Sequence, residues 1–194
     1  MSNVVAIIPA RGNSQRIPLK NIRLFHGKPI IAYSISAAIE SKLFDRVIVS
    51  TDNQLIAAVA QQYGAEVIMR SDEMSQNEVG TQEVMAHVLK DIECEYACCL
   101  YPCAPMLASN SLNLALQYLK FGTVLYVVPV ATWLRDPGQF YFGRRDAFIN
   151  NWPLRIAQLM PIDPATECDI NTMADWERAE KMFAELHGIK DAVP

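Results

Sequence analysis

Long hydrophobic runs are absent from this sequence of 194 residues. No stretch reaches the roughly 18 consecutive apolar residues that a membrane-spanning helix needs. The start, MSNVVAIIPARG, also lacks the basic segment, apolar core and cleavage site of a secretory signal, so we interpret it as a strand. These absences favour a cytoplasmic protein with no membrane partner. The length and the hydrophobic content of 51% suit a single domain over residues 1–194.

Cysteine patterns for zinc sites or disulfide frameworks are also absent. Four of the five cysteines lie between Cys94 and Cys103, but the C-x-x-C pairs and histidine partners of structural zinc sites are missing. A zinc site is the alternative interpretation. We expect reduced and mostly buried thiols, as in cytoplasmic proteins.

Acidic residues are missing from the first 39 positions, although the whole chain has a formal net charge of −4. The negative total argues against general binding to nucleic acid. A cationic segment in an anionic protein indicates a small polyanionic ligand, and a solvated loop is the simpler alternative. The first acid is Glu40, and the basic residues before it are Arg11, Arg16, Lys20, Arg23 and Lys28.

Short apolar, β-branched runs alternate with amphipathic helical segments. This alternation predicts an α/β fold, a three-layer sandwich with a mostly parallel sheet. Ligands bind at the carboxyl ends of strands in such folds, so the basic loop and the stretches STDN, YPCAP and GQFY should share one rim. The expected strands are 3–10, 46–51, 65–70, 95–102 and 123–130, and the expected helices are 29–44, 53–64, 82–92 and 109–120.

Two helix starts have recognisable caps. Asp52 is the expected cap of the second helix, and Thr172 with Asp175 resembles a capping box at the start of a C-terminal helix. That last helix should bury one apolar stripe, formed by Trp176, Ala179, Phe183 and Leu186.

The loop after the first strand, ARGNSQRIPLKN, matches neither common nucleotide-binding fingerprint. It lacks the G-K-[S/T] ending of a Walker A loop, and Gly12 alone cannot supply a G-x-G-x-x-G pattern. The Gly-Asn-Ser turn at 12–14 still favours backbone N–H groups that bind an anion. Arg11, Arg16 and Lys20 add positive charge, and these features together suit a triphosphate.

At this loop the sequence resembles the acylneuraminate cytidylyltransferases, the CMP-sialic acid synthetases, whose signature is roughly IPARGGSKRIPxKN. The resemblance continues in order along nearly the whole chain, through VIVSTDN, MRSDEMS, LYPCAP, GQFYFG and CDINTMADWERAEKMF. It is nearest to the branch of the family that activates pseudaminic acid. Several motifs in the right order are far more specific than one loop.

The resemblance implies a Rossmann-like nucleotidyltransferase fold and a particular reaction. The anomeric hydroxyl of a nine-carbon α-keto acid sugar attacks the α-phosphate of CTP, and a CMP-sugar and pyrophosphate result, with Mg²⁺ as cofactor. Such a transfer depends on positioning and on stabilisation of charge. The absence of a Ser-His-Asp or Cys-His set is therefore no objection.

The matched motifs imply roles for individual residues. Arg11, Arg16 and Asp169 are the expected catalytic residues, and Asp169 and Asn171 are the expected Mg²⁺ ligands, because this ion prefers oxygen. The expected nucleotide-binding residues are Arg11, Gly12, Asn13, Ser14, Gln15, Arg16, Lys20, Asn21, Arg70, Tyr101 and Pro102. The expected substrate-binding residues are Cys103, Ala104, Pro105, Gln139, Phe140 and Tyr141.

The sequence departs from the family pattern at four places. Gln15 stands where the family has a phosphate-contacting lysine, and Asn13 replaces a glycine, which its tolerance of left-handed geometry permits. Asn171 replaces the second aspartate of the DID motif and brings no charge to the metal. Only residues 131–137 connect YVVPV to GQFYFG, where the family has a longer segment that packs across a dimer and closes the sugar site.

These departures leave three hypotheses open. The first is an active cytidylyltransferase of the sialic-acid type, whose partners are CTP and an acidic sugar. The second is a nucleotide- or sugar-binding paralogue with weak or no transferase activity. The third is a transferase for another sugar acid or nucleotide. The resemblance implies a homodimer, although the usual dimer segment looks deleted, with Arg135 and Asp136 as remnants of its far end.

Overall fold

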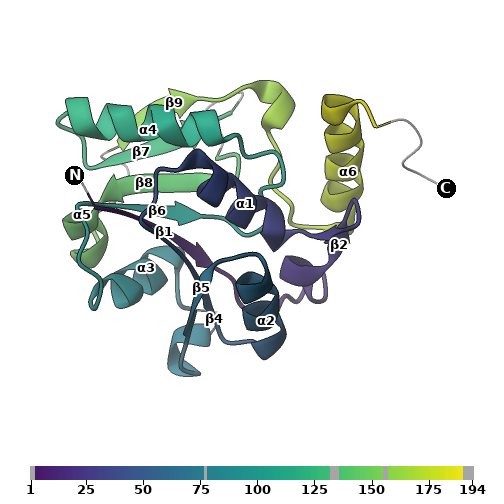
Figure 1. The fold of residues 1–194 in the computed structure, drawn as a ribbon, viewed down its shortest axis with the longest axis horizontal. Helices are drawn as coiled ribbons and strands as arrows, with labels where there is room; N and C mark the ends of the chain where they lie inside the picture. The colour runs from purple at the N-terminus through teal and green to yellow at the C-terminus, as the bar shows by residue number, and fades with distance from the viewer. Residues whose placement is uncertain (1–2, 77, 132–135, 155–156, 190–194) are drawn as a thin grey trace.

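One sheet of seven strands organises the computed structural model, which describes residues 3–76, 78–131, 136–154 and 157–189 (Figure 1). The strand order is β5-β4-β1-β6-β8-β7-β9. β8 runs antiparallel to both of its neighbours, and the other pairs are parallel. The strands are β1 (Val4–Pro9), β4 (Arg46–Thr51), β5 (Glu66–Met69), β6 (Tyr96–Leu100), β7 (Tyr126–Val130), β8 (Phe140–Arg144) and β9 (Ala157–Pro161).

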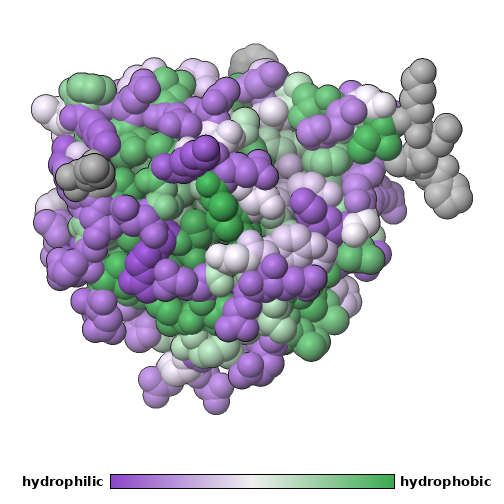
Figure 2. All heavy atoms as spheres, in the orientation of Figure 1, coloured by the Kyte–Doolittle hydropathy of each residue, from purple (hydrophilic) through white to green (hydrophobic). Residues whose placement is uncertain are grey.

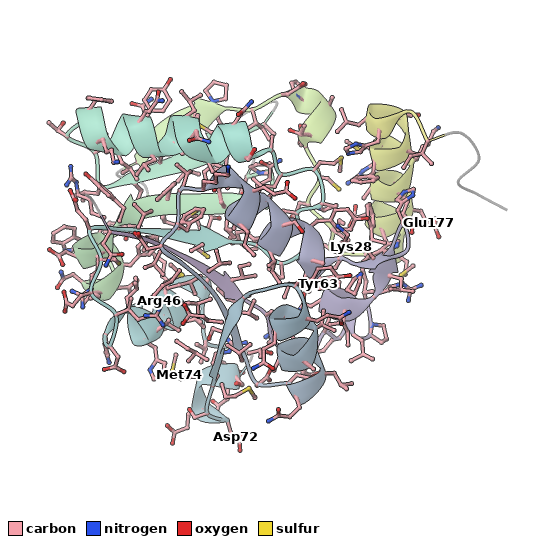
Figure 3. All side chains as sticks on the ribbon, in the orientation of Figure 1. Lys28, Arg46, Tyr63, Asp72, Met74 and Glu177 are labelled. Carbon is pink, nitrogen blue, oxygen red and sulfur yellow. The ribbon has the colours of Figure 1, made fainter. Side chains whose placement is uncertain are left out.

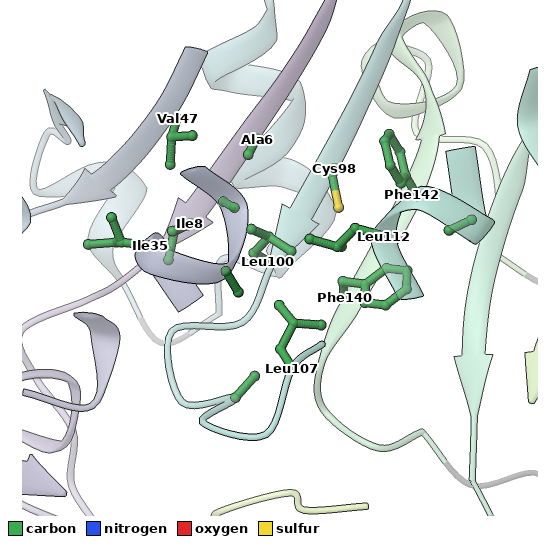
Figure 4. Close-up of a cluster of buried hydrophobic side chains, with 14 of the residues drawn as sticks. Ala6, Ile8, Ile35, Val47, Cys98, Leu100, Leu107, Leu112, Phe140 and Phe142 are labelled. Carbon is green, nitrogen blue, oxygen red and sulfur yellow. The ribbon is translucent and has the colours of Figure 1, made fainter. Parts of the chain in front are cut away.

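Helices cover both faces of this sheet, which confirms the predicted three-layer α/β architecture. On one face lie α1 (Ile31–Ser41), α2 (Gln54–Gln62) and α4 (Ser109–Phe121), and on the other lie α3 (Thr81–Leu89) and α5 (Arg145–Ile149). Strand β1 shows the two-residue alternation that such a fold requires. Ala6 and Ile8 belong to the cluster on the first face, shown in Figure 4, while Val5 and Ile7 face the second.

A third apolar cluster holds the last helix, α6 (Met173–His187), against a small hairpin of β2 (Leu24–Phe25) and β3 (Lys28–Pro29). The ring of Phe25 lies 5.5 Å from Trp176 and 5.4 Å from Phe183, centroid to centroid. This cluster fixes α6 next to the basic loop. The expected helix from residue 29 is shorter at its start, since Pro29 pairs in β3 and α1 begins at Ile31.

The hairpin also contacts the helical layer. The ammonium group of Lys28 lies 5.1 Å from the ring centroid of Tyr33 and 6.0 Å from that of Tyr63 (Figure 3). Short 3₁₀ helices complete the described elements: η1 (Lys20–Ile22), η2 (Glu73–Ser75) and η4 (Pro164–Thr166).

The exterior is of mixed polarity. Figure 2 shows one face, on which hydrophilic residues surround smaller hydrophobic areas, as on most globular proteins. None of the helices in the described part of the chain has the length and hydropathy that a bilayer crossing demands. All five cysteines are free, and all except Cys94 are buried, as expected.

Candidate active site

The predicted rim exists. Strands β1 and β4 run in register so that Pro9 pairs with Ser50, and β6 ends at Leu100 opposite Phe140 of β8. Because β8 is antiparallel, it contributes its beginning to this rim, whereas β1, β4 and β6 contribute their carboxyl ends. The stretches that follow or precede these strand ends therefore lie together.

A cavity of about 280 Å³, here called the loop cavity, opens at this rim. It brings together residues far apart in the sequence: the basic loop, the loop after β6, Gly138 and the segment 169–171. The expected nucleotide-binding residues that line it are Arg11, Ser14, Gln15, Arg16, Lys20, Asn21, Tyr101 and Pro102. Asn13 lies on the exposed side of the loop.

Two cations of the basic loop contact the segment 169–171. The guanidinium of Arg16 donates from Nη2 to Oδ1 of Asn171 at 2.7 Å, and Lys20 donates from Nζ to the carbonyl oxygen of Ile170 at 2.7 Å. The positive charge of the loop is thus held at the cavity wall by partners some 150 positions later in the chain.

Asn21 joins the basic loop to the loop after β6. Its side chain is buried, and Nδ2 donates to the carbonyl of Arg11 at 2.9 Å, while Oδ1 accepts from the thiol of Cys103 at 3.4 Å. Burial raises the pKa of Cys103 to about 12, so its sulfur keeps the proton that it donates. In this arrangement Asn21 positions the backbone of Arg11.

The turn at Gly12 differs from the expected anion-binding arrangement. The N–H of Gly12 donates to Oδ1 of Asp52 at 2.6 Å, and that of Ser14 donates to the carbonyl of Gly12 at 3.0 Å. Two of the expected amides are therefore already hydrogen-bonded within the protein. A β-carbon at Gly12 would lie 2.7 Å from Cβ of Asn53, which explains the glycine.

The predicted cap of α2 is wrong by one residue. Asn53 is the cap, because its Oδ1 accepts from the N–H groups of Leu55 and Ile56. Asp52 instead supports the basic loop through Gly12. Both side chains can cap a helix, and the sequence pattern alone does not distinguish them.

Arg70, directly after β5, has a buried guanidinium with unsatisfied donors. Its Nε and Nη2 have no hydrogen-bond partner among the described residues, and Nη1 donates to the carbonyl of Met74 at 3.4 Å. Burial lowers the pKa of Arg70, an effect that the nearby carboxylate of Asp52 opposes. Buried donors without protein partners are uncommon in folded proteins, and a water, an ion or a ligand can satisfy them.

Most of the expected substrate-binding residues do not reach a cavity at this rim. Phe140 is fully buried in the core beside Phe142 (Figure 4), and Ala104 and Pro105 are also buried. Gln139 is 2% exposed, and its Nε2 donates to the carbonyl of Thr166 at 2.9 Å. The substrate-binding role of these four residues stays a prediction, and their side chains pack inside the protein behind the rim.

The other two members of that group lie next to the cavities. Cys103 lines the loop cavity. The hydroxyl of Tyr141 donates to the carboxylate of Asp136 and lies 3.4 Å from the hydroxyl of Tyr101. Burial is the main cause of the raised pKa of Tyr141, which remains a neutral donor.

The expected metal ligands lie together, but Asn171 is engaged otherwise. Its Oδ1 accepts from Arg16, and its Nδ2 donates to Oδ2 of Asp169 at 2.5 Å. Within the described ranges, no group of three or more His, Cys, Asp or Glu side chains converges to hold a metal ion. Mg²⁺ commonly binds through one or two carboxylates together with substrate phosphates, so Asp169 fits that role once a triphosphate is present.

A second and larger cavity, of about 540 Å³, adjoins the first and was not predicted. We call it the α6 cavity, because α6 forms one wall. Asp169 and Asn171 line both cavities, and the other lining residues are Asp136, Pro164, Glu167, Asp175, Arg178 and Met182. The one feature of the sequence that points to this cavity is the spacing of Asp175 and Arg178, which are three residues apart and therefore share a helix face.

A mostly parallel sheet with its ligand loops at the carboxyl ends of the strands is the architecture of nucleotide-binding α/β proteins. The chain matches the family described as Cytidylyltransferase over residues 5–141, and it belongs to that family. The sequence prediction of a cytidylyltransferase enzyme is thus confirmed.

Curated relatives agree over most of the chain. A pseudaminic acid cytidylyltransferase of Campylobacter jejuni is 30% identical, over 94% of this chain and 97% of the relative. A CMP-N,N′-diacetyllegionaminic acid synthase of Legionella pneumophila is 34% identical over 69% of this chain and 62% of its own length. The first alignment spans 227 positions, more than the 194 residues here, so that relative contains residues without a counterpart in this chain.

Solved structures agree on the fold. The structure of CMP:2-keto-3-deoxy-manno-octonic acid synthetase, complexed with CTP, superimposes with a TM-score of 0.79 over 95% of this chain and all of the other. Its sequence identity is 17%, so this likeness concerns the fold. A nucleotidyl transferase from Methanothermobacter gives a TM-score of 0.76.

Proposed function

We propose that this cytidylyltransferase transfers CMP from CTP to a nine-carbon α-keto acid sugar of the pseudaminic or sialic-acid type and releases pyrophosphate. The observation that carries the proposal is the loop cavity, in which three basic residues of one loop, Arg11, Arg16 and Lys20, meet the acidic segment at Asp169. The names of the relatives that align over most of the chain support the sugar class.

The triphosphate is assigned to the basic loop. Arg16 and Lys20 are held by hydrogen-bond acceptors at the cavity wall, and phosphate oxygens are better acceptors for these cations because they carry charge. Arg11 is positioned through its carbonyl by the buried Asn21. The buried donors of Arg70 are assigned to the base or ribose of CTP, since they lack partners among the described residues.

Transfer requires the sugar hydroxyl to reach the α-phosphate while negative charge grows on the leaving pyrophosphate. Arg11 and Arg16 stabilise that charge by preorganised donors. Asp169 would hold Mg²⁺, and the bound ion would neutralise phosphate charge. Asn171 orients the Asp169 carboxylate, to which it donates a hydrogen bond. No protein nucleophile is needed, because the sugar hydroxyl is the nucleophile.

Pyrophosphate release from CTP and Mg²⁺ against pseudaminic, legionaminic and N-acetylneuraminic acids and Kdo tests the proposal. We expect release with one of the nine-carbon sugars. Release with Kdo alone would show a transferase for another sugar acid. Binding of CTP without release in any mixture would refute the proposed reaction and favour a paralogue that only binds.

A further inference from the structure

We infer that the α6 cavity is the acceptor site, and that Arg178 binds the carboxylate of the acceptor sugar. This inference rests on the proposed function and locates its second substrate. It begins from position: an acceptor hydroxyl must approach phosphates in the loop cavity, and the α6 cavity shares two wall residues with it, Asp169 and Asn171. At about 540 Å³ it has the size of a small-molecule site, for which about 300–1,000 Å³ is usual.

The GQFY motif offers few exposed side chains. The residues that the sequence motif GQFY offers to a sugar are mostly inside the protein, with Phe140 in the core and Gln139 bound to the carbonyl of Thr166. A sugar at this rim therefore meets the α6 cavity, whose wall carries the side chains of Asp136 and Glu167. Carboxylates at such positions accept hydrogen bonds from sugar hydroxyls.

A sugar acid brings its own negative charge into this acidic wall and needs a cation. Among the described residues that line the α6 cavity, Arg178 is the single basic side chain. A guanidinium carries five N–H donors and can bind a carboxylate through two of them. The charge pattern of the cavity thus assigns the carboxylate end of the acceptor to Arg178 and its hydroxyls to the acids.

The guanidinium of Arg178, whose side chain is 59% exposed, contacts a carboxylate that the start of α6 holds in place. Nη2 contacts Oδ1 of Asp175 at 3.0 Å, and Oδ2 of Asp175 is fixed by the N–H groups of Asn171 and Thr172. On the other side of the helix, Trp176 and Ala179 are buried against the third apolar cluster. Arg178 therefore stands on a rigid element, as specific recognition requires.

Steady-state kinetics on two variants of α6 test the inference. Arg178→Ala should lower kcat/KM for the sugar acid about 10- to 100-fold, the loss expected for one charge-assisted contact, while the Kd of CTP stays unchanged. Lys181→Ala is the matched control, since it removes the same charge from an exposed position of the same helix and should leave kcat/KM within about twofold. Arg178→Lys should recover part of the loss.

An acceptor whose carboxylate is a methyl ester distinguishes loss of the carboxylate contact from a general loss of folded enzyme. We expect the wild type to use the ester less well than the free acid. The Arg178→Ala variant should use the ester as well as the wild type does. If Arg178→Ala matches Lys181→Ala, or loses as much with the ester as with the acid, the inference is wrong while the proposed function stands. If the wild type uses no sugar acid at all, the proposed function fails and the inference fails with it.

Discussion

At the scale of single residues, Arg16 connects the basic loop to the acidic segment. Replacing it with alanine removes one charged donor from the predicted triphosphate site. We expect Arg16→Ala to weaken CTP binding at least about tenfold, measured by calorimetry. Arg46→Ala is the control: Arg46 begins β4, at the opposite end from the rim (Figure 3), and its exposed ion pair with Glu66 is worth little. Equal losses in the two variants would refute the assignment.

Asn171 is the uncharged member of the predicted pair of metal ligands. Nδ2 of Asn171 lies 2.5 Å from Oδ2 of Asp169, so Asn171→Asp places a second carboxylate beside the first. The same change turns the contact with Arg16 into an ion pair. We expect weaker CTP binding in EDTA and a lower Mg²⁺ concentration for half-maximal activity, since the ion gains a ligand. Asn110→Asp, which adds the same charge on α4, should change neither quantity. An unchanged Mg²⁺ requirement in Asn171→Asp would contradict the role given to this position.

The sequence predicted the basic loop of the site better than the substrate-binding residues, for a physical reason. The basic loop was found because charge and turn formers are visible in a sequence. Phe140 and Gln139 were assigned to the substrate because motif matching ignores the direction of side chains. The two-residue alternation of a strand places Phe140 and Phe142 on one face of the sheet and Tyr141 on the other. Apolar clusters cover both faces, so the alternation alone does not tell which of these side chains reaches a ligand.

At the scale of elements, α6 forms a wall of the proposed acceptor site, and its start is fixed by the predicted capping box. Oγ1 of Thr172 accepts from the N–H of Asp175, and Oδ2 of Asp175 accepts in return from the N–H of Thr172 at 2.8 Å. The apolar stripe was predicted correctly at Trp176, Ala179 and Phe183, which are buried, and wrongly at Leu186, which is 46% exposed.

Removing this cap should destabilise the protein measurably. Thr172→Ala is expected to cost about 1 kcal/mol of unfolding free energy, or about 2–4 °C in Tm for a chain of this size. Thr172→Ser keeps the hydroxyl and should remain close to the wild type. Thermal unfolding of the three proteins measures the effect. A Tm for Thr172→Ala equal to that of the wild type would show that the capping box contributes nothing to stability.

The main elements followed from the sequence, but two features of the sheet did not. The β2–β3 hairpin has strands of two residues, too short for periodicity, although its turn at His26 and Gly27, both with positive φ, contains the glycine that such turns favour. The antiparallel direction of β8 is not encoded in hydrophobic pattern, since alternation is the same in either direction. Because β8 is antiparallel, it starts at the rim, and the GQFY motif at its start therefore lies there.

At the scale of the whole molecule, the short connection at 131–137 separates this chain from the pattern of its family. Residues 132–135, with Arg135, lie outside the described part of the chain. Asp136 is described, and it accepts from the N–H of Gly138 and lines the α6 cavity. The longer alignment with the Campylobacter relative agrees with residues missing here. The homodimer stays a prediction.

The central claim is that one chain joins CMP to a sugar acid. The most direct measurement is mass spectrometry of the products from CTP, Mg²⁺ and pseudaminic acid, with pyrophosphate quantified in the same mixture. The account predicts a CMP-sugar whose amount equals that of pyrophosphate, and a reduced yield of both with Arg16→Ala. Pyrophosphate without a CMP-sugar, or neither product despite bound CTP, would contradict it.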